Sequence, residues 1–223
     1  MIRVSAINFN GFNIAFKGDK QQENDVTINA ALETLKDITF FRDDVKYVKK
    51  LGAKPPFKNG RQAYDFIKDN GIQVKFMQLP SDNIHAQWDI ANKTIKINEK
   101  YKDTKSKAVT LAIAESILHE AGHSKDLDGD SSIQEELNCL ALNSMAHRSL
   151  NAKDPGIFEA NDANILKNGV NLYSAIYFNP NLEGLVNKIQ KSYGHLPAGD
   201  NKHPASQFAN AIKNGQTNFE ISA

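Results

Sequence analysis

The sequence predicts an α+β fold, in which a small, mostly antiparallel sheet packs on one central helix and further helices follow toward the C-terminus. Apolar and polar residues alternate through much of the segment 72–99, as they do in half-buried strands. The segment 108–123 is apolar nearly all round, which is typical of a helix that runs through the core of a domain. Apolar residues recur at helical spacing in several segments after residue 132.

The N-terminal region, residues 1–59, is expected to contribute a hairpin and a helix. Apolar and polar residues alternate on both sides of Asn10-Gly11, a pair that favours the tight turn of a β-hairpin. Apolar residues recur at helical spacing between 28 and 38 and predict an amphipathic helix of about three turns. Glycines and prolines crowd the segment 51–60, where we expect a linker.

The main, catalytic domain is expected to span residues 60–223, and residues 1–59 either precede it as a separate region or form part of the same domain. Its predicted strands are 72–79, 85–90 and 93–99. The last two form a hairpin that turns near Ala91-Asn92 and ends in an edge strand. The predicted helices are 61–70, 108–123, 132–150, 158–167, 182–193 and 204–213.

Composition and charge predict a soluble, cytoplasmic protein. No apolar run approaches the roughly 18–20 residues that a membrane-spanning helix needs, and the N-terminus lacks the pattern of a secretory signal, so no membrane partner is expected. The 27 Lys and Arg residues nearly balance the 26 Asp and Glu residues, which gives no electrostatic reason to expect nucleic acid as a partner. Cys139 is the single cysteine and cannot form an internal disulfide.

An HExxH motif, His119-Glu120-Ala121-Gly122-His123, lies within the most apolar helix. Residues four apart share one face of a helix, so His119 and His123 can offer two imidazole nitrogens to one tetrahedral Zn²⁺. Glu120 is then beside the metal, where it can accept a proton from a water molecule as a general base. Three ionisable groups buried on one turn without a metal would carry a large desolvation cost. The motif therefore predicts a zinc site.

The third metal ligand is expected from the start of the next helix, which carries Glu135 and Glu136. The segment Ser132-Ile133-Gln134-Glu135 matches a capping box, in which the Glu135 side chain bonds back to the helix start. That assignment leaves Glu136 as the preferred ligand and Glu135 as the alternative. The acidic segment 126–130 between the two helices is expected to be a solvated turn.

Four other polar residues are candidates to support the ligands through hydrogen bonds. They are Glu115, Asn138, Asn143 and His147.

The strand TIKIN, the helix ending in HEAGH and the following helix EELNCLALNSM resemble the ImmA/IrrE-like metallopeptidases over residues 85–150. The resemblance implies a zincin-like fold of the gluzincin type, with His119, His123 and Glu136 as the metal set. It implies a zinc-dependent metallopeptidase that hydrolyses a peptide or protein substrate through a metal-activated water. The alternative is a non-catalytic zincin scaffold that binds a protein partner around a structural metal.

A further donor is expected to stabilise the oxyanion of the reaction. In HExxH enzymes, a Tyr or His from outside the metal-binding helices commonly supplies it. We expect His203, because it begins a predicted helix and because His203-Pro204 is similar to a segment found late in the HtpX-like peptidases. His195 and Tyr193 are the alternatives.

Overall fold

A computed structural model describes residues 25–126, 129–159 and 182–217. Its helices are α1 (Val26–Asp37), α2 (Arg42–Lys50), α3 (Gly60–Asp69), α4 (Lys107–His123), α5 (Ile133–Lys153), α7 (Glu183–Tyr193) and α8 (Gln207–Lys213). Its strands are β1 (Gln73–Met77), β2 (Ala86–Asp89) and β3 (Thr94–Asn98). The predicted α+β class is confirmed. The hairpin expected around Asn10-Gly11 and most of the helix expected over 158–167 lie outside the described residues.

The sheet is mixed, so the expectation of a mostly antiparallel sheet was wrong. Its strand order is β1-β3-β2, with β3 antiparallel to β2 and parallel to β1. The hairpin expected over 85–99 is present, but β3 is the central strand and β2 is at an edge. The side chains of Ile95 and Ile97 in β3 are fully buried, which favours the central position for this strand. Residues 78–85 carry the chain from β1 to the far side of β3.

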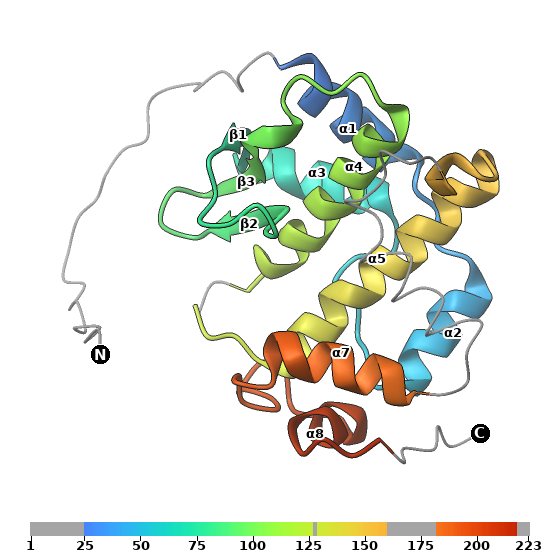
Figure 1. Ribbon diagram of the computed structural model, residues 1–223, viewed down its shortest axis with the longest axis vertical. Coiled ribbons are helices and arrows are strands. Elements are labelled where there is room, and N and C mark those ends of the chain that lie inside the picture. Colours follow the sequence, from blue (N-terminus) through green and yellow to red (C-terminus); the bar gives the residue numbers. More distant parts are fainter. Residues whose placement is uncertain (1–24, 127–128, 160–181, 218–223) are drawn as a thin grey trace.

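Helices α4 and α5 cross the middle of the molecule (Figure 1). The buried face of α4 contacts α1, α3, the sheet and α5. Leu142 and Met145 of α5 belong to that same core, whereas Ile133 and Leu137 pack in a second cluster with α7 and α8. The start of α5 therefore lies where the two hydrophobic clusters meet. Among the described residues, no helix combines the length and the hydropathy that crossing a bilayer requires.

Helix α2 was not expected from the sequence, because its segment is rich in charge and short. Its stability comes from tertiary contacts. Val48 is buried in the main core, and the fully buried carboxylate of Asp44 pairs with Arg148 of α5. Contacts with a distant helix therefore define α2, and local periodicity does not reveal them.

The first turn of α5 is held by the loop between α7 and α8. The backbone N–H groups of Ile133 and Gln134 donate to the carbonyls of Pro197 and Ala198, at 2.9 and 3.1 Å. The hydroxyl of Ser132, the N-cap residue, accepts a third backbone N–H from this turn. These bonds satisfy N–H groups that a helix start leaves without intrahelical partners. The loop and the cap together fix the position at which α5 begins.

Gly122 allows α4 and α5 to approach each other closely. A Cβ atom at this position would lie 2.7 Å from the Sγ atom of Cys139 and 3.1 Å from a methyl group of Leu142, both on α5. Any side chain at position 122 would therefore force the Cys139 and Leu142 side chains to move or the two helices to separate.

We expect Gly122→Ala to lower the free energy of unfolding by about 0.5–2 kcal/mol. The strain of overpacking, about 1–3 kcal/mol, should exceed the gain in helix propensity of up to about 1 kcal/mol. Gly184→Ala is the matched control, because no atom lies within 4 Å of a Cβ built there. It should leave stability unchanged or slightly higher. Urea unfolding followed by circular dichroism measures both variants, and equal effects would contradict the close-packing argument.

Candidate metal centre

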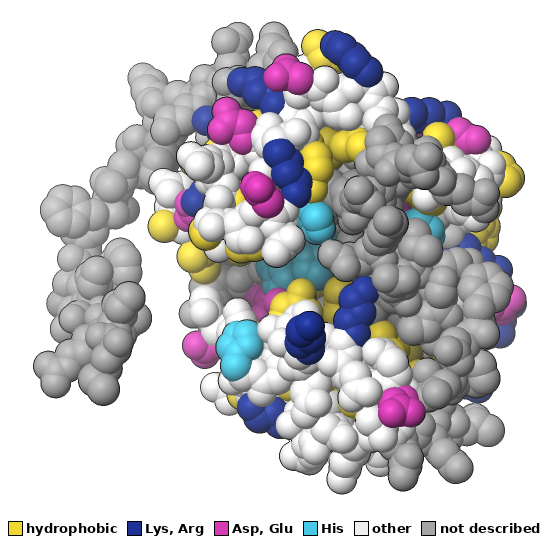
Figure 2. All heavy atoms as spheres, viewed as in Figure 1, with side chains coloured by type: hydrophobic (Ala, Val, Ile, Leu, Met, Phe, Trp, Pro, Cys, Tyr) yellow, Lys and Arg dark blue, Asp and Glu magenta, His cyan; other side chains and the backbone are white. Residues whose placement is uncertain are grey.

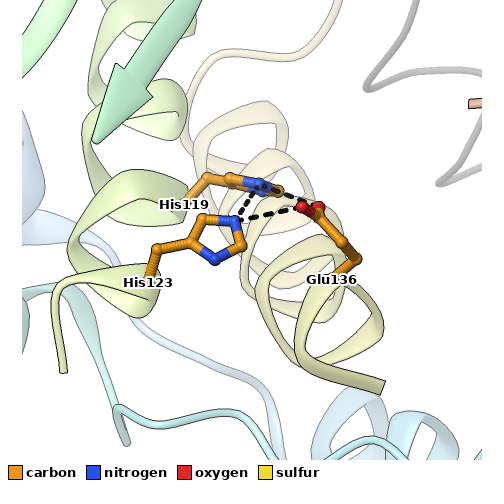
Figure 3. Close-up of side chains that lie close together, drawn as sticks. All are labelled: His119, His123 and Glu136. Carbon is orange, nitrogen blue, oxygen red and sulfur yellow. Dashed lines mark hydrogen bonds and ion pairs between the residues drawn. The ribbon is translucent and has the colours of Figure 1, made fainter. Parts of the chain in front are cut away.

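His119, His123 and Glu136 face one another across the interface between α4 and α5 (Figure 3). The Nε2 atoms of the two histidines are 3.1 Å apart, and each lies 3.6 Å from one oxygen of the Glu136 carboxylate. A tetrahedral zinc ion with bonds of about 2.0–2.1 Å separates its ligand atoms by about 3.3 Å. The three side chains therefore offer donor atoms at the spacing that one metal ion requires. The structure brings Glu136 to this position and places Glu135 elsewhere.

Each imidazole is oriented by a hydrogen bond to its other nitrogen. The Nδ1 atom of His119 lies 2.5 Å from Oδ1 of Asn143, and that of His123 lies 2.6 Å from Oε1 of Glu135. The Asn143 amide is held in this orientation because its Nδ2 donates to the backbone carbonyl of Glu115. Both Nδ1 atoms therefore carry a proton, so each imidazole in its neutral form presents the lone pair of its Nε2 atom to the space between the ligands. Lone pairs this close repel unless a proton or a cation lies between them.

Glu136 supplies the negative charge that such a cation needs. Its Oε2 atom is buried and has no hydrogen-bond partner among the described residues. Burial by itself raises the pKa of this carboxyl group, but the neighbouring imidazoles of His119 and His123 outweigh burial and lower the pKa. A buried carboxylate with an unsatisfied oxygen, opposite two imidazole nitrogens, fits a divalent metal such as Zn²⁺.

Glu120 lies beside this group and not within it. Its Oε2 atom accepts a hydrogen bond of 2.7 Å from the backbone N–H of Trp88 on the edge strand β2. Glu120 and the three candidate ligands line a cleft of about 380 Å³ that also contacts β2, the loop before α5 and Tyr193. Figure 2 shows histidine side chains in the depth of a hollow near the centre of one face. The space beside Glu120 is large enough for a bound ligand.

Tyr193, one of the two alternatives for the oxyanion donor, reaches the cleft from the end of α7. Burial, followed by the nearby carboxylates of Glu136 and Glu120, raises the pKa of the Tyr193 hydroxyl, which therefore stays protonated at neutral pH. Tyr193 follows the buried residue Ile189 by one helical turn. This spacing places Tyr193 on the buried face of α7, but it does not by itself indicate the cleft.

The structure does not bring His203 into the cleft. The imidazole lines a separate pocket of about 110 Å³. Its Nε2 donates to the Asp126 carboxylate at 2.7 Å, and its Nδ1 accepts from the Asn138 amide at 3.3 Å. His203 therefore ties the loop before α8 to the segment after α4 and to α5. His195 is exposed and does not line the cleft.

Asp126, Asp200 and His203 form a second group whose donor atoms lie close together. The Asn138 amide oxygen accepts the backbone N–H of Lys54, so its nitrogen is the group that donates to Nδ1 of His203. The remaining ring nitrogen must then carry the proton that it donates to Asp126, and it has no lone pair for a metal. The ammonium group of Lys202 also pairs with Asp126. We therefore assign this group to holding the loop in place.

Of the other residues expected to support the ligands, some lie near the candidate metal centre and others pair in the core. Asn143 contacts a candidate ligand directly, and Glu115 contributes through its backbone carbonyl. The Glu115 carboxylate instead pairs with His147 at 3.1 Å in the core.

Half of the predicted capping box is present. The Ser132 hydroxyl accepts the backbone N–H of Glu135, as predicted. The Glu135 carboxylate, however, bonds to His123 and does not bend back to the helix start. A histidine on another helix is the competing partner, and no local pattern reveals it.

Comparison with known proteins finds no matching family model, curated protein or solved structure. The geometry of the site therefore carries the functional argument.

We expect the wild-type protein to bind one zinc ion per chain, and we expect His123→Ala and Glu136→Ala to lose it. Glu135→Ala should keep zinc but bind it about 10- to 100-fold more weakly, because it removes a hydrogen bond that orients a ligand. Glu99→Ala changes an exposed carboxylate and serves as the control. Competition with a chromophoric chelator measures the dissociation constants.

A wild-type protein that stays metal-free after folding with zinc would contradict the site. Complete loss of zinc in Glu135→Ala, with tight binding kept in Glu136→Ala, would exchange the roles of the two glutamates.

Proposed function

We propose that this chain is a zinc-dependent metallopeptidase that hydrolyses a peptide or protein substrate, with Glu120 as the general base. The observation that carries the proposal is the place of Glu120, which lies in the cleft beside the candidate ligands and outside the ligand set. Three protein ligands leave one tetrahedral position open. A purely structural zinc site is usually closed by four protein ligands and has no use for a base beside it.

Zinc bound by His119, His123 and Glu136 would polarise the scissile carbonyl and make a water molecule acidic. Glu120 accepts the proton of that water and passes it to the leaving amine. The Tyr193 hydroxyl donates a hydrogen bond to the oxygen on which negative charge develops. In this proposal Tyr193 takes over the donor role that the sequence suggested for His203.

The outer edge of β2, which pairs with no other strand among the described residues, supports the choice of a polypeptide substrate. The backbone N–H of Asn98 in β3 donates to the carbonyl of His85, so every second residue from His85 onward faces β3. The backbone groups of Ala86 and Trp88 consequently face away from the sheet, and both residues line the cleft. An extended peptide can form backbone hydrogen bonds with such an edge.

We expect Glu120→Gln to keep its zinc and to lose hydrolysis by roughly 10²- to 10⁴-fold. The amide has nearly the same shape as the carboxylate but cannot accept the proton. The rate is measured with a fluorogenic unfolded protein substrate, and zinc content is measured on the same sample. A variant that cleaves as fast as wild type would remove Glu120 from the proposed mechanism. Zinc binding by the wild type without any hydrolysis would favour the scaffold alternative.

We expect Tyr193→Phe to lower kcat by roughly tenfold to a thousandfold with unchanged zinc content, as for one lost donor to the oxyanion. His203→Ala is the comparison. It should leave kcat of the zinc-loaded protein within about twofold, because the imidazole does not line the cleft. It should also lower stability by about 1–2 kcal/mol through the loss of two partly buried hydrogen bonds. The reverse pattern would return the donor role to His203.

A further inference from the structure

A backbone group of β2 contacts the side chain that we propose as the base. The N–H of Trp88 donates to Oε2 of Glu120 at 2.7 Å, and Oε1 of Glu120 has no hydrogen-bond partner among the described residues. The donor is part of the main chain of a strand, whereas the acceptor ends a flexible side chain. The strand therefore restricts the conformations that the Glu120 carboxylate can adopt.

We propose that the backbone N–H of Trp88 is a positioning group for Glu120, holding Oε2 so that Oε1 is left to accept the proton. This inference rests on the proposed function. An anchored carboxylate keeps the distance to the reacting water constant, and a small misplacement of a reacting group can cost about 10²-fold in rate.

The rest of the strand makes this anchor rigid. Trp88 is paired in register with Ile95 of β3, whose side chain is fully buried. The partly buried side chain of Trp88 packs against the main hydrophobic core. The donor is thus fixed through both its backbone and its side chain.

The Trp88 side chain does not supply the polar contact. Its Nε1 atom is buried and has no hydrogen-bond partner among the described residues. The contact with Glu120 uses the main chain alone, so a change of side chain that keeps the N–H should preserve it. Removal of the N–H should abolish it.

One strand would then serve the substrate and the base together. The backbone of Ala86 and the carbonyl of Trp88 face the cleft, where an extended peptide would pair. Because Glu120 is hydrogen-bonded to the same strand, the register of a bound peptide along β2 also determines which peptide bond lies beside the base.

The contact is tested first without substrate. Amide hydrogen exchange at Trp88, measured by NMR on the full chain, should become at least tenfold faster in Glu120→Ala than in wild type. Glu99→Ala, an exposed carboxylate elsewhere, should leave that rate unchanged. An unchanged exchange rate in Glu120→Ala would overturn the inference and leave the proposed function standing.

The role in catalysis is tested with Trp88→Pro against Trp88→Ala. Both variants lose the indole, but only proline lacks the N–H, and proline is tolerated on an edge strand where the N–H faces away from the sheet. We expect kcat of Trp88→Pro to be about 10- to 100-fold below that of Trp88→Ala, with equal KM and zinc content. In a Glu120→Gln background the two variants should have equal residual rates, because no base remains to be positioned.

Equal kcat values for folded, zinc-loaded Trp88→Pro and Trp88→Ala would overturn the inference alone. If the proline variant does not fold, the α-hydroxy acid analogue of tryptophan at position 88 removes the N–H and keeps the side chain. The same loss of kcat is then expected, and full activity would overturn the inference. A wild-type protein that binds zinc and hydrolyses no polypeptide would overturn the proposed function, and the base-positioning role with it.

Discussion

The close packing of α4 against α5 is the contact on which the candidate site depends. Two imidazoles come from α4 and the carboxylate comes from α5, so the 3.6 Å separations between imidazole and carboxylate are properties of the helix interface, whereas the 3.1 Å between the imidazoles follows from their spacing along α4. Gly122 permits this approach because its missing side chain leaves room for Cys139. Hydrophobic burial along both helices stabilises the interface. Polar groups gather where the two helices meet the cleft.

The polar atoms of the candidate ligands fall into two groups. The outer atoms face supporting residues, and the inner atoms face one another. The outer nitrogens of both histidines have oxygen acceptors, one from Asn143 and one from Glu135. The inner atoms are two imidazole nitrogens 3.1 Å apart and a buried oxygen of Glu136 that lacks a hydrogen-bond partner among the described residues. Such a pattern is costly unless a cation completes it. The group around His203 differs, because one ring nitrogen of His203 donates to Asp126 and the other accepts from the Asn138 amide.

The mixed strand order has a direct consequence for the cleft. In a simple meander, β2 would be the central strand and its backbone groups would all be paired. Because β1 pairs with β3 instead, one edge of β2, beside the HExxH helix, pairs with no strand among the described residues. That edge provides the N–H that reaches Glu120 and the backbone groups that face the cleft. The strand order of the sheet therefore determines which backbone groups lie beside the proposed base.

The sequence by itself determined the features that repeat over a few residues. The spacing of four puts His119 and His123 on one face of a helix, and Ser132 marks the start of α5. Only the tertiary structure decided between Glu135 and Glu136, because neighbouring residues on a helix point about 100° apart and the packing of α5 sets its rotation. Tertiary contacts also placed Tyr193 in the cleft, His203 outside it and β2 at the edge. Each of these depends on contacts between segments distant in the chain, which local periodicity does not encode.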